Sequence, residues 1–105
     1  MTNAVFKRSG SRLALHCEGH AEYDEYGKDI VCSGISALCQ SLAMWCRNQD
    51  DVDIIAHIQE PGKFRLTVDG GDTEPWKAVA MGFLGIANRY PDHVSVKISE
   101  NFFES

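Results

Sequence analysis

A histidine and a cysteine that could act together lie twelve positions apart in the first third of the sequence. His20 follows Gly19, and Cys32 follows Asp29-Ile30-Val31. If Asp29 is the N-cap of a helix, Cys32 is its N3 residue, where free backbone N–H groups and the positive end of the helix dipole favour thiolate over thiol. The same amides can hold an oxyanion, and His20 can act as general base and then protonate a leaving amine. This spacing predicts a nucleophilic cysteine with a histidine partner.

Two other interpretations of Cys32 stay open on the residues alone. Cysteine is among the most buried residue types, so a cysteine at a helix start is often inert packing. A reactive thiol can also act as a redox sensor without any peptide chemistry. Asp29 acts in two directions, because a carboxylate beside Cys32 opposes the thiolate, whereas the same carboxylate can orient or pair with His20.

Zinc binding is a weaker interpretation of the same region. His16, Cys17, His20 and Cys32 are residue types that bind zinc. His16 and Cys17 are adjacent on a strand and point to opposite faces, which leaves at most three ligands for one site. The run His20-Ala21-Glu22 matches the H-x-E half of the zinc deaminase signature, but the P-C-x-x-C half is absent. Three ligands leave zinc only a weak possibility, so we expect no metal site here.

The remaining cysteines and histidines are assigned to the core or to the solvated surface. Cys39 and Cys46 follow the apolar stripe of a predicted helix, and Cys17 shares a strand face with leucines, so all three are predicted to be core residues. No C-x-x-C pair exists, and a seven-residue helical spacing is too long for a disulfide. His57 alternates onto the outer face of its strand and His93 falls in a loop, and we expect both to be solvated.

Hydrophobic periodicity predicts the elements that position these residues. Period-two alternation predicts strands at 4–7, 12–19, 52–58, 63–69 and 94–99. A 3.6-residue period predicts a helix over 29–48, capped by Asp29, after a loop over 20–28, and a second helix that begins with Thr73 as its cap and stops at Pro91. Glu60-Pro61-Gly62 fits a type II turn within a hairpin. The order ββαββαβ predicts an α+β two-layer sandwich, with a mixed or antiparallel sheet and two helices, as one domain over residues 1–105.

Composition and charge exclude several classes of protein. With 44% hydrophobic residues among 105, the chain is too apolar for disorder. No uninterrupted apolar run approaches the ~20 residues of a membrane span. No apolar stretch follows the basic pair Lys7-Arg8, so we expect no signal peptide, no membrane and a cytoplasmic location. The formal net charge is −5 with scattered basic residues, which argues against direct nucleic-acid binding and suits a basic peptide partner.

The segment around His20 and Cys32 resembles the signature of the ribosomal-processing cysteine protease (Prp) family. The matching residues are Gly19-His20-Ala21, Tyr26-Gly27, Asp29-Ile30-Val31-Cys32 and Ser36-Ala37. The resemblance implies that Cys32 is the nucleophile, that His20 is the base, and that Asp29 and Ser36 support them. This sequence differs from the family pattern at Ser33-Gly34, where two small residues, commonly alanine or glycine, are found. It differs also in the acidic character of residues 21–25.

The family resemblance also implies a substrate and a setting. It predicts a small bacterial cytoplasmic homodimer without a cofactor, in which the loop between His20 and Cys32 lies over the peptide site. It predicts an endopeptidase that removes the N-terminal extension of a large-subunit ribosomal protein precursor, after an aromatic residue. The alternative is a non-catalytic module that binds a peptide or a ribosomal protein in the same groove.

Overall fold

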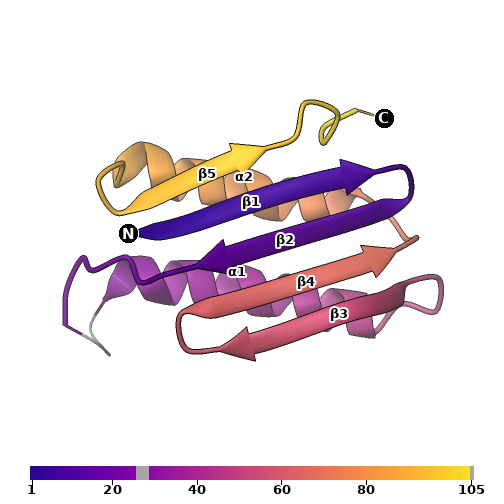
Figure 1. Ribbon diagram of the computed structural model, residues 1–105, viewed down its shortest axis with the longest axis horizontal. Coiled ribbons are helices and arrows are strands. Elements are labelled where there is room, and N and C mark those ends of the chain that lie inside the picture. The colour runs from indigo at the N-terminus through magenta and orange to yellow at the C-terminus, as the bar shows by residue number, and fades with distance from the viewer. Residues whose placement is uncertain (26–28, 105) are drawn as a thin grey trace.

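The computed structural model describes residues 1–25 and 29–104, and its elements follow the order predicted from the sequence. Tyr26, Gly27 and Lys28, which include part of the family motif and of the predicted loop, lie outside the described residues, as does Ser105. The elements shown in Figure 1 are β1 (Thr2–Ser9), β2 (Arg12–Glu18), α1 (Ile30–Arg47), β3 (Asp53–Glu60), β4 (Lys63–Asp69), α2 (Glu74–Arg89) and β5 (Val94–Ile98).

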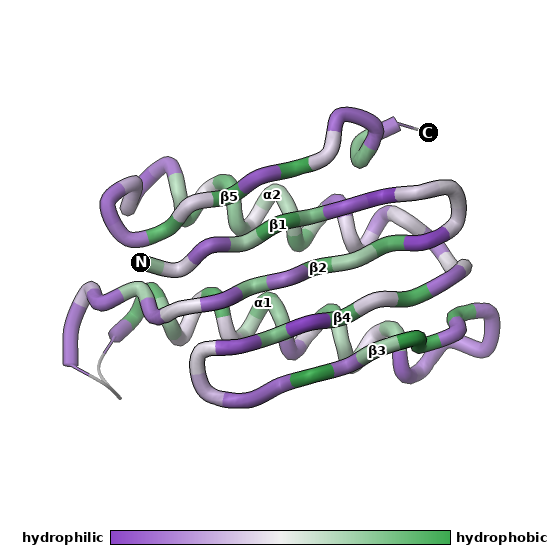
Figure 2. Tube along the Cα trace, viewed as in Figure 1, coloured by the Kyte–Doolittle hydropathy of each residue, from purple (hydrophilic) through white to green (hydrophobic). Residues whose placement is uncertain are grey.

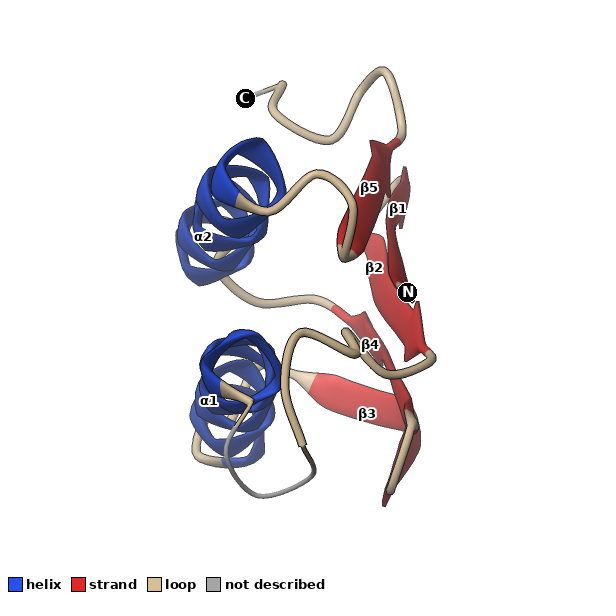
Figure 3. Cartoon of the chain, turned by 90° about the vertical axis from the view of Figure 1, so that its left-hand side faces the viewer, coloured by secondary structure: helices blue, strands red, loops and turns tan. Residues whose placement is uncertain are grey.

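A mixed five-stranded sheet forms one layer of the molecule, in the spatial order β3-β4-β2-β1-β5. β1 pairs antiparallel with β2 and parallel with β5, and β4 lies antiparallel to both β2 and β3. Both helices cover the same face of this sheet, and the opposite face is open (Figure 3). This arrangement confirms the predicted α+β two-layer sandwich with its two hairpins.

The core lies between the sheet and the helices and is built by the alternation of each strand. Leu13, Leu15 and Cys17 of β2 face inward and are buried, as predicted. The ring of Phe6 on β1 meets Phe83 of α2 edge-on, with centroids 5.2 Å apart. Hydrophobic and hydrophilic residues alternate along the strands in Figure 2. Burial of one face of each strand therefore joins the sheet to the helix layer.

α1 contains Cys32 in its first turn and also contributes buried residues to the core. Its 18 residues have a mean hydropathy of 1.2, so by length and composition it could cross a membrane, which a count of uninterrupted apolar residues does not reveal. Its buried residues lie on one stripe against the sheet; they are Val31, Ile35, Cys39, Leu42, Ala43 and Cys46. This amphipathic packing is that of a core helix. It also confirms the predicted core positions of Cys39 and Cys46, whose thiols are free.

The start of α2 differs from the prediction. Thr73 occupies the N-cap position, but its backbone is helical and its hydroxyl makes no capping hydrogen bond. The carboxylate of Asp72 instead accepts from the N–H of Glu74 at 2.9 Å. The predicted Thr73 cap is wrong because the preceding acid reaches the free amide first.

A β-bulge in β3 overturns the expected orientation of His57. The register of β3 on β4 shifts between Ile54 and Ala56, so that His57 pairs with Leu66, a buried inward residue. His57 therefore faces the helix layer, half-buried, where Nη2 of Arg47 donates to its Nδ1 at 2.6 Å. The prediction of a solvated His57 on the outer face is wrong, because one extra residue reverses the faces of the residues that follow.

Candidate active site

The start of α1 is fixed by Asp29, which is the N-cap as predicted. Oδ1 of Asp29 accepts hydrogen bonds from the N–H groups of Val31 at 2.9 Å and of Cys32 at 3.0 Å. The Asp29 carbonyl accepts from the N–H and from the hydroxyl of Ser33, both at 3.0 Å. The expectation that these amides hold an oxyanion is wrong, because the cap residue already occupies them.

The second carboxylate oxygen of Asp29 holds the loop that follows β2. Oδ2 accepts from the N–H of Tyr23 at 2.9 Å and from that of Asp24 at 3.4 Å. Burial raises the pKa of Asp29, but the N–H donors of Cys32, Tyr23 and Asp24 outweigh it and hold that pKa below the ordinary 3.8. Asp29 is thus an ionised clamp that joins the loop to the helix.

The Cys32 thiol lies half-buried at the first turn of α1. Its Sγ accepts a hydrogen bond from the N–H of Ala21 at 3.3 Å. Burial and the neighbouring Asp29 carboxylate raise the pKa of Cys32 above its ordinary 9.0, although the Ala21 N–H acts in the opposite direction. The predicted preference for thiolate at the helix start is therefore outweighed, and the predicted opposition of Asp29 is confirmed.

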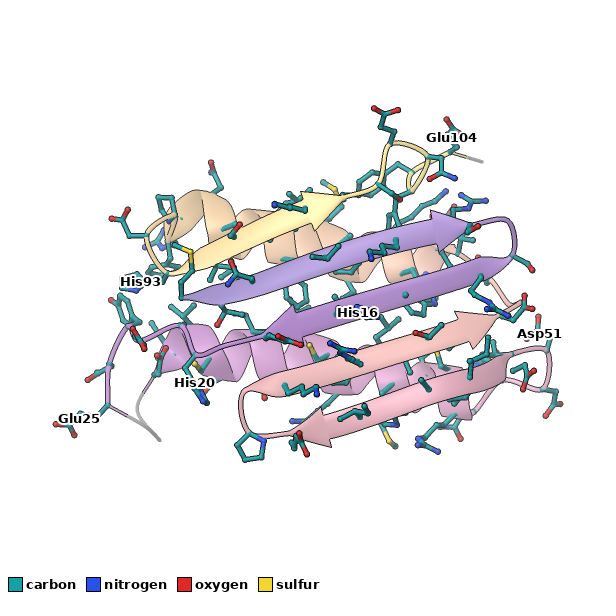
Figure 4. The ribbon with its side chains drawn as sticks, viewed as in Figure 1. His16, His20, Glu25, Asp51, His93 and Glu104 are labelled. Atoms are coloured by element: carbon teal, nitrogen blue, oxygen red, sulfur yellow. The ribbon has the colours of Figure 1, made fainter. Side chains whose placement is uncertain are left out.

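His20 stands beyond the end of β2, on the side of the turn between β3 and β4 (Figure 4). Gly19 has φ of 99°, a backbone conformation that favours glycine. A Cβ at this position would lie only 2.3 Å from the backbone oxygen of Met1, so a larger residue would clash there. The His20 ring is exposed and packs on Gly62, where a Cβ would lie 2.8 Å from Nε2. Within residues 1–25 and 29–104, no hydrogen bond joins His20 to Cys32.

One open cleft of about 780 Å³ brings the predicted site residues together. His20, Asp29, Cys32 and Ser36 all line it. Ser36 is exposed one helical turn beyond Cys32, as its spacing predicts. The cleft is floored by inward side chains of β2, α1 and β4 and bounded by the turn between β3 and β4; these further lining residues include Cys17, Ile35, Cys39, Phe64 and Gly62.

Metal binding finds no support in the described part of the chain. Among residues 1–25 and 29–104, no group of three histidine, cysteine or acidic side chains could hold a metal ion. Cys17 is buried on the inner face, whereas His16 pairs with Arg65 on the open face of the sheet. Alternation along β2 thus separates the two residues, as expected.

Two residues of the site region were missed by sequence reasoning. His93, expected to be solvated, is half-buried, and its Nδ1 lies 2.9 Å from the carbonyl oxygen of Ala21. Tyr23 stacks edge-on against both Tyr90 and His93, at 5.1 and 5.4 Å. The expectation for His93 is wrong because its partner lies 72 residues away, a separation that carries no local signal.

A thiol at a helix start and an exposed histidine line one cleft of the α+β sandwich, and these are the side chains that thiol-dependent hydrolases use. The chain belongs to the family described as cysteine protease Prp, whose model matches residues 1–95. It is therefore a cysteine protease. The non-catalytic alternative is not favoured.

Individual relatives agree with this family assignment. The ribosomal processing cysteine protease Prp of Mycoplasma genitalium is 30% identical over 97 residues, which are 88% of this chain and 94% of that protein. The ribosomal processing protease Prp of S. aureus, solved with a covalently linked product peptide, matches with a TM-score of 0.73 at 21% identity, over 94% of this chain and all of that one. A Streptococcus mutans protein matches with a TM-score of 0.69 at 26% identity, over 93% of each chain. These likenesses confirm the predicted fold.

Proposed function

We propose that this cysteine protease is an endopeptidase of ribosome assembly, which removes the N-terminal extension of a large-subunit ribosomal protein precursor. The observation that carries the proposal is the shared cleft of Cys32 and His20 in a member of the Prp family. The S. aureus relative has been solved both with a covalently linked product peptide and with a substrate peptide. An open cleft of about 780 Å³ offers room for such a peptide.

Cys32 acts as the nucleophile and His20 as its acid and base. Because burial and Asp29 raise the pKa of Cys32, the thiol needs a base, and His20 takes its proton as Sγ attacks the scissile carbonyl carbon. His20 then protonates the leaving amine, which leaves a thioester on Cys32. A water molecule then gives one proton to His20 as its hydroxide adds to the acyl carbon. The C–S bond breaks, His20 returns the proton to Sγ, and the released acid loses its own proton to solvent as the carboxylate product.

This cycle requires the His20 ring to turn toward Sγ. Its present contact is Gly62, and it makes no hydrogen bond within residues 1–25 and 29–104, so rotation about its side-chain bonds breaks little. Geometries of this kind commonly tighten when substrate binds.

Asp29 and Ser36 have supporting roles in this proposal. Asp29 fixes both the helix start and the loop, so that Cys32 and Ala21 keep their positions. Ser36 presents a hydroxyl to the same cleft one turn further along α1, where a peptide backbone can bind to it. Neither residue forms a covalent bond with the substrate or transfers a proton in this cycle.

The test is incubation of the extended ribosomal protein precursor with three forms of the enzyme, read by intact mass. Wild type and Cys46→Ala should release one defined N-terminal fragment, because Cys46 is a core thiol outside the cleft. Cys32→Ala should release none while remaining folded. Cleavage by Cys32→Ala would overturn the assignment of the nucleophile.

A redox sensor based on Cys32 is less well supported. Sensor cysteines are accessible thiols with a low pKa, whereas burial and Asp29 raise the pKa of Cys32. We therefore give preference to peptide hydrolysis, in which His20 supplies the base that the thiol lacks.

The proposal extends to assembly and location. We propose one catalytic domain over residues 1–105, active as a homodimer in the bacterial cytoplasm. β3 and β5 are the outer strands of the sheet, and the exposed Ile55 and Ile58 on β3 make that edge a candidate interface. Sedimentation equilibrium of wild type and Ile58→Lys tests the homodimer; a monomeric wild type would contradict it.

A further inference from the structure

His93 lies in the turn between α2 and β5, and hydrogen bonds fix both its backbone N–H and its backbone carbonyl. Its N–H donates to the carbonyl of Tyr90 at 3.0 Å, and its own carbonyl accepts from the N–H of Thr2 at 2.9 Å. Thr2 opens β1 and pairs there with Val94 of β5. The side chain therefore projects from a fixed point of the sheet toward the loop after β2, beside the N-terminus (Figure 4).

The ring of His93 is oriented by aromatic neighbours and by one hydrogen bond. Tyr23 packs edge-on against His93 at 5.4 Å and against Tyr90 at 5.1 Å, which joins the loop to the end of α2. Nδ1 of His93 lies 2.9 Å from the carbonyl oxygen of Ala21. Because a carbonyl oxygen only accepts, Nδ1 must carry the proton of this bond.

Ala21 connects His93 to the cleft, because it makes one hydrogen bond to His93 and another to Cys32. It is 1% exposed, so the loop is packed at this position. Its carbonyl accepts from His93, and its N–H donates to Sγ of Cys32 at 3.3 Å. The N–H groups of Val31 and Cys32 are bonded to Asp29, so the backbone donors directed at the sulfur come from the loop, with Ala21 the stronger and Glu22 the weaker.

We propose that His93 is a positioning residue of the protease, which fixes Ala21 so that its N–H stabilises the Cys32 thiolate. This inference rests on the proposed role of Cys32. A donor held in place before reaction costs no reorganisation when the charge forms, whereas a donor on a free loop must be ordered at each turnover. The loop side of the cleft is thus attached to the sheet through a residue distant in sequence.

Two substitutions separate the hydrogen bond from the ring contact. His93→Phe keeps an aromatic ring against Tyr23 and removes the donor. His93→Asn removes the ring and places an N–H donor at the position of Nδ1. If the hydrogen bond matters, asparagine restores function and phenylalanine does not; if packing alone matters, the order is reversed.

The first readout is the rate at which iodoacetamide alkylates Cys32 in the peptide-free protein, followed by peptide mapping. We expect His93→Phe to slow alkylation about threefold to fivefold, since the lost bond lowers the thiolate fraction while the remaining thiolate becomes more nucleophilic. His93→Asn should stay within about twofold of wild type, as expected when a neutral donor replaces a neutral donor. Wild-type alkylation in His93→Phe, or equal slowing in both variants, overturns the proposal.

The second readout is cleavage of the precursor by the same variants. We expect kcat of His93→Phe to fall about fivefold with KM within about twofold, because the bond acts on the thiolate and not on the bound peptide. If wild type cleaves no precursor, the proposed substrate fails, whereas the alkylation readout still decides the role of His93.

Thermal unfolding of each variant distinguishes lost positioning from lost folding. If His93→Phe does not fold, His93→Gln replaces it in the comparison, because glutamine places its donor at the position of Nε2 and not of Nδ1. Faster alkylation of Cys32 in His93→Asn than in His93→Gln then supports the proposal, and equal rates refute it.

Discussion

Asp29→Asn separates two tasks that one carboxylate performs at the start of α1. Oδ1 caps the helix at Val31 and Cys32, and Oδ2 holds the loop at Tyr23 and Asp24. An asparagine side chain has one carbonyl oxygen and one amide group that only donates. Whichever way the amide turns, one pair of backbone N–H groups faces another donor.

The size of the effect follows from the bonds that are lost. Asparagine caps a helix as well as aspartate does, so the loop bonds of 2.9 and 3.4 Å are those that break. Both bonds are only partly buried, so each is worth about 0.5–1.5 kcal/mol, and we expect the free energy of unfolding to fall by about 1–3 kcal/mol for the pair. For a domain of this length, Tm should fall by about 5–15 °C.

The stability that Asp29 contributes depends on pH, because only the ionised carboxylate accepts all four hydrogen bonds. The N–H donors outweigh burial and hold the pKa of Asp29 below 3.8, so its contribution to stability is present above that pH and is lost as the pH falls through the lowered pKa. The stability difference between wild type and Asp29→Asn should therefore be full at neutral pH and vanish in strong acid. Denaturant titration at several pH values measures it.

Asp29→Asn should also make the Cys32 thiol easier to ionise, although it destabilises the fold. Removing the Asp29 charge removes one cause of the raised pKa of Cys32, so alkylation of Cys32 should reach half its maximal rate at a lower pH. Asp72→Asn is the control, because Asp72 caps α2 through a single bond and stands outside the cleft. An Asp29→Asn protein with wild-type stability, or with an unshifted alkylation profile, refutes the reasoning.

Further predictions concern a glycine of the turn and the cap of α2. Gly62→Ala should destabilise the protein by about 1–2 kcal/mol through left-handed strain, and it should also lower kcat, because its Cβ would lie 2.8 Å from Nε2 of His20 at φ of 75°. Gly10→Ala, with φ of 60° and open space, should show the strain alone; equal activities would contradict the position of His20. Asp72→Ala should cost about 1 kcal/mol and Thr73→Ala only a few tenths in denaturant titration, and the reverse order would contradict the Asp72 cap.

Local signals in the sequence were sufficient for the helix that carries the nucleophile. An acid before an apolar periodic run identifies Asp29 as the N-cap, and counting from it places Cys32 in the first turn. The cap also shows why one expectation failed. A side chain that satisfies the free amides of a helix start removes them from any other use, and the sequence alone does not reveal where its oxygens point.

Register and long-range contact could not be predicted in the same way. Ile54, Ile55 and Ile58 are compatible with either face of β3, so periodicity does not detect the bulge that turns His57 inward. The bond between His93 and Ala21 depends on β5 lying beside β1, which is a property of the sheet order. Residues that position a catalytic loop from another part of the sheet therefore escape motif reading.

The parallel pairing of β1 with β5 also determines the order in which the molecule can assemble. β1 finds β2 within the first 18 residues, but its other neighbour begins only at Val94. Contacts between distant segments form late, because a long loop must close before they gain anything. The nascent chain therefore carries Cys32 and His20 long before His93 can reach Ala21. The contact that fixes Ala21 beside the nucleophile therefore forms only after β5 has been synthesised and has paired with β1.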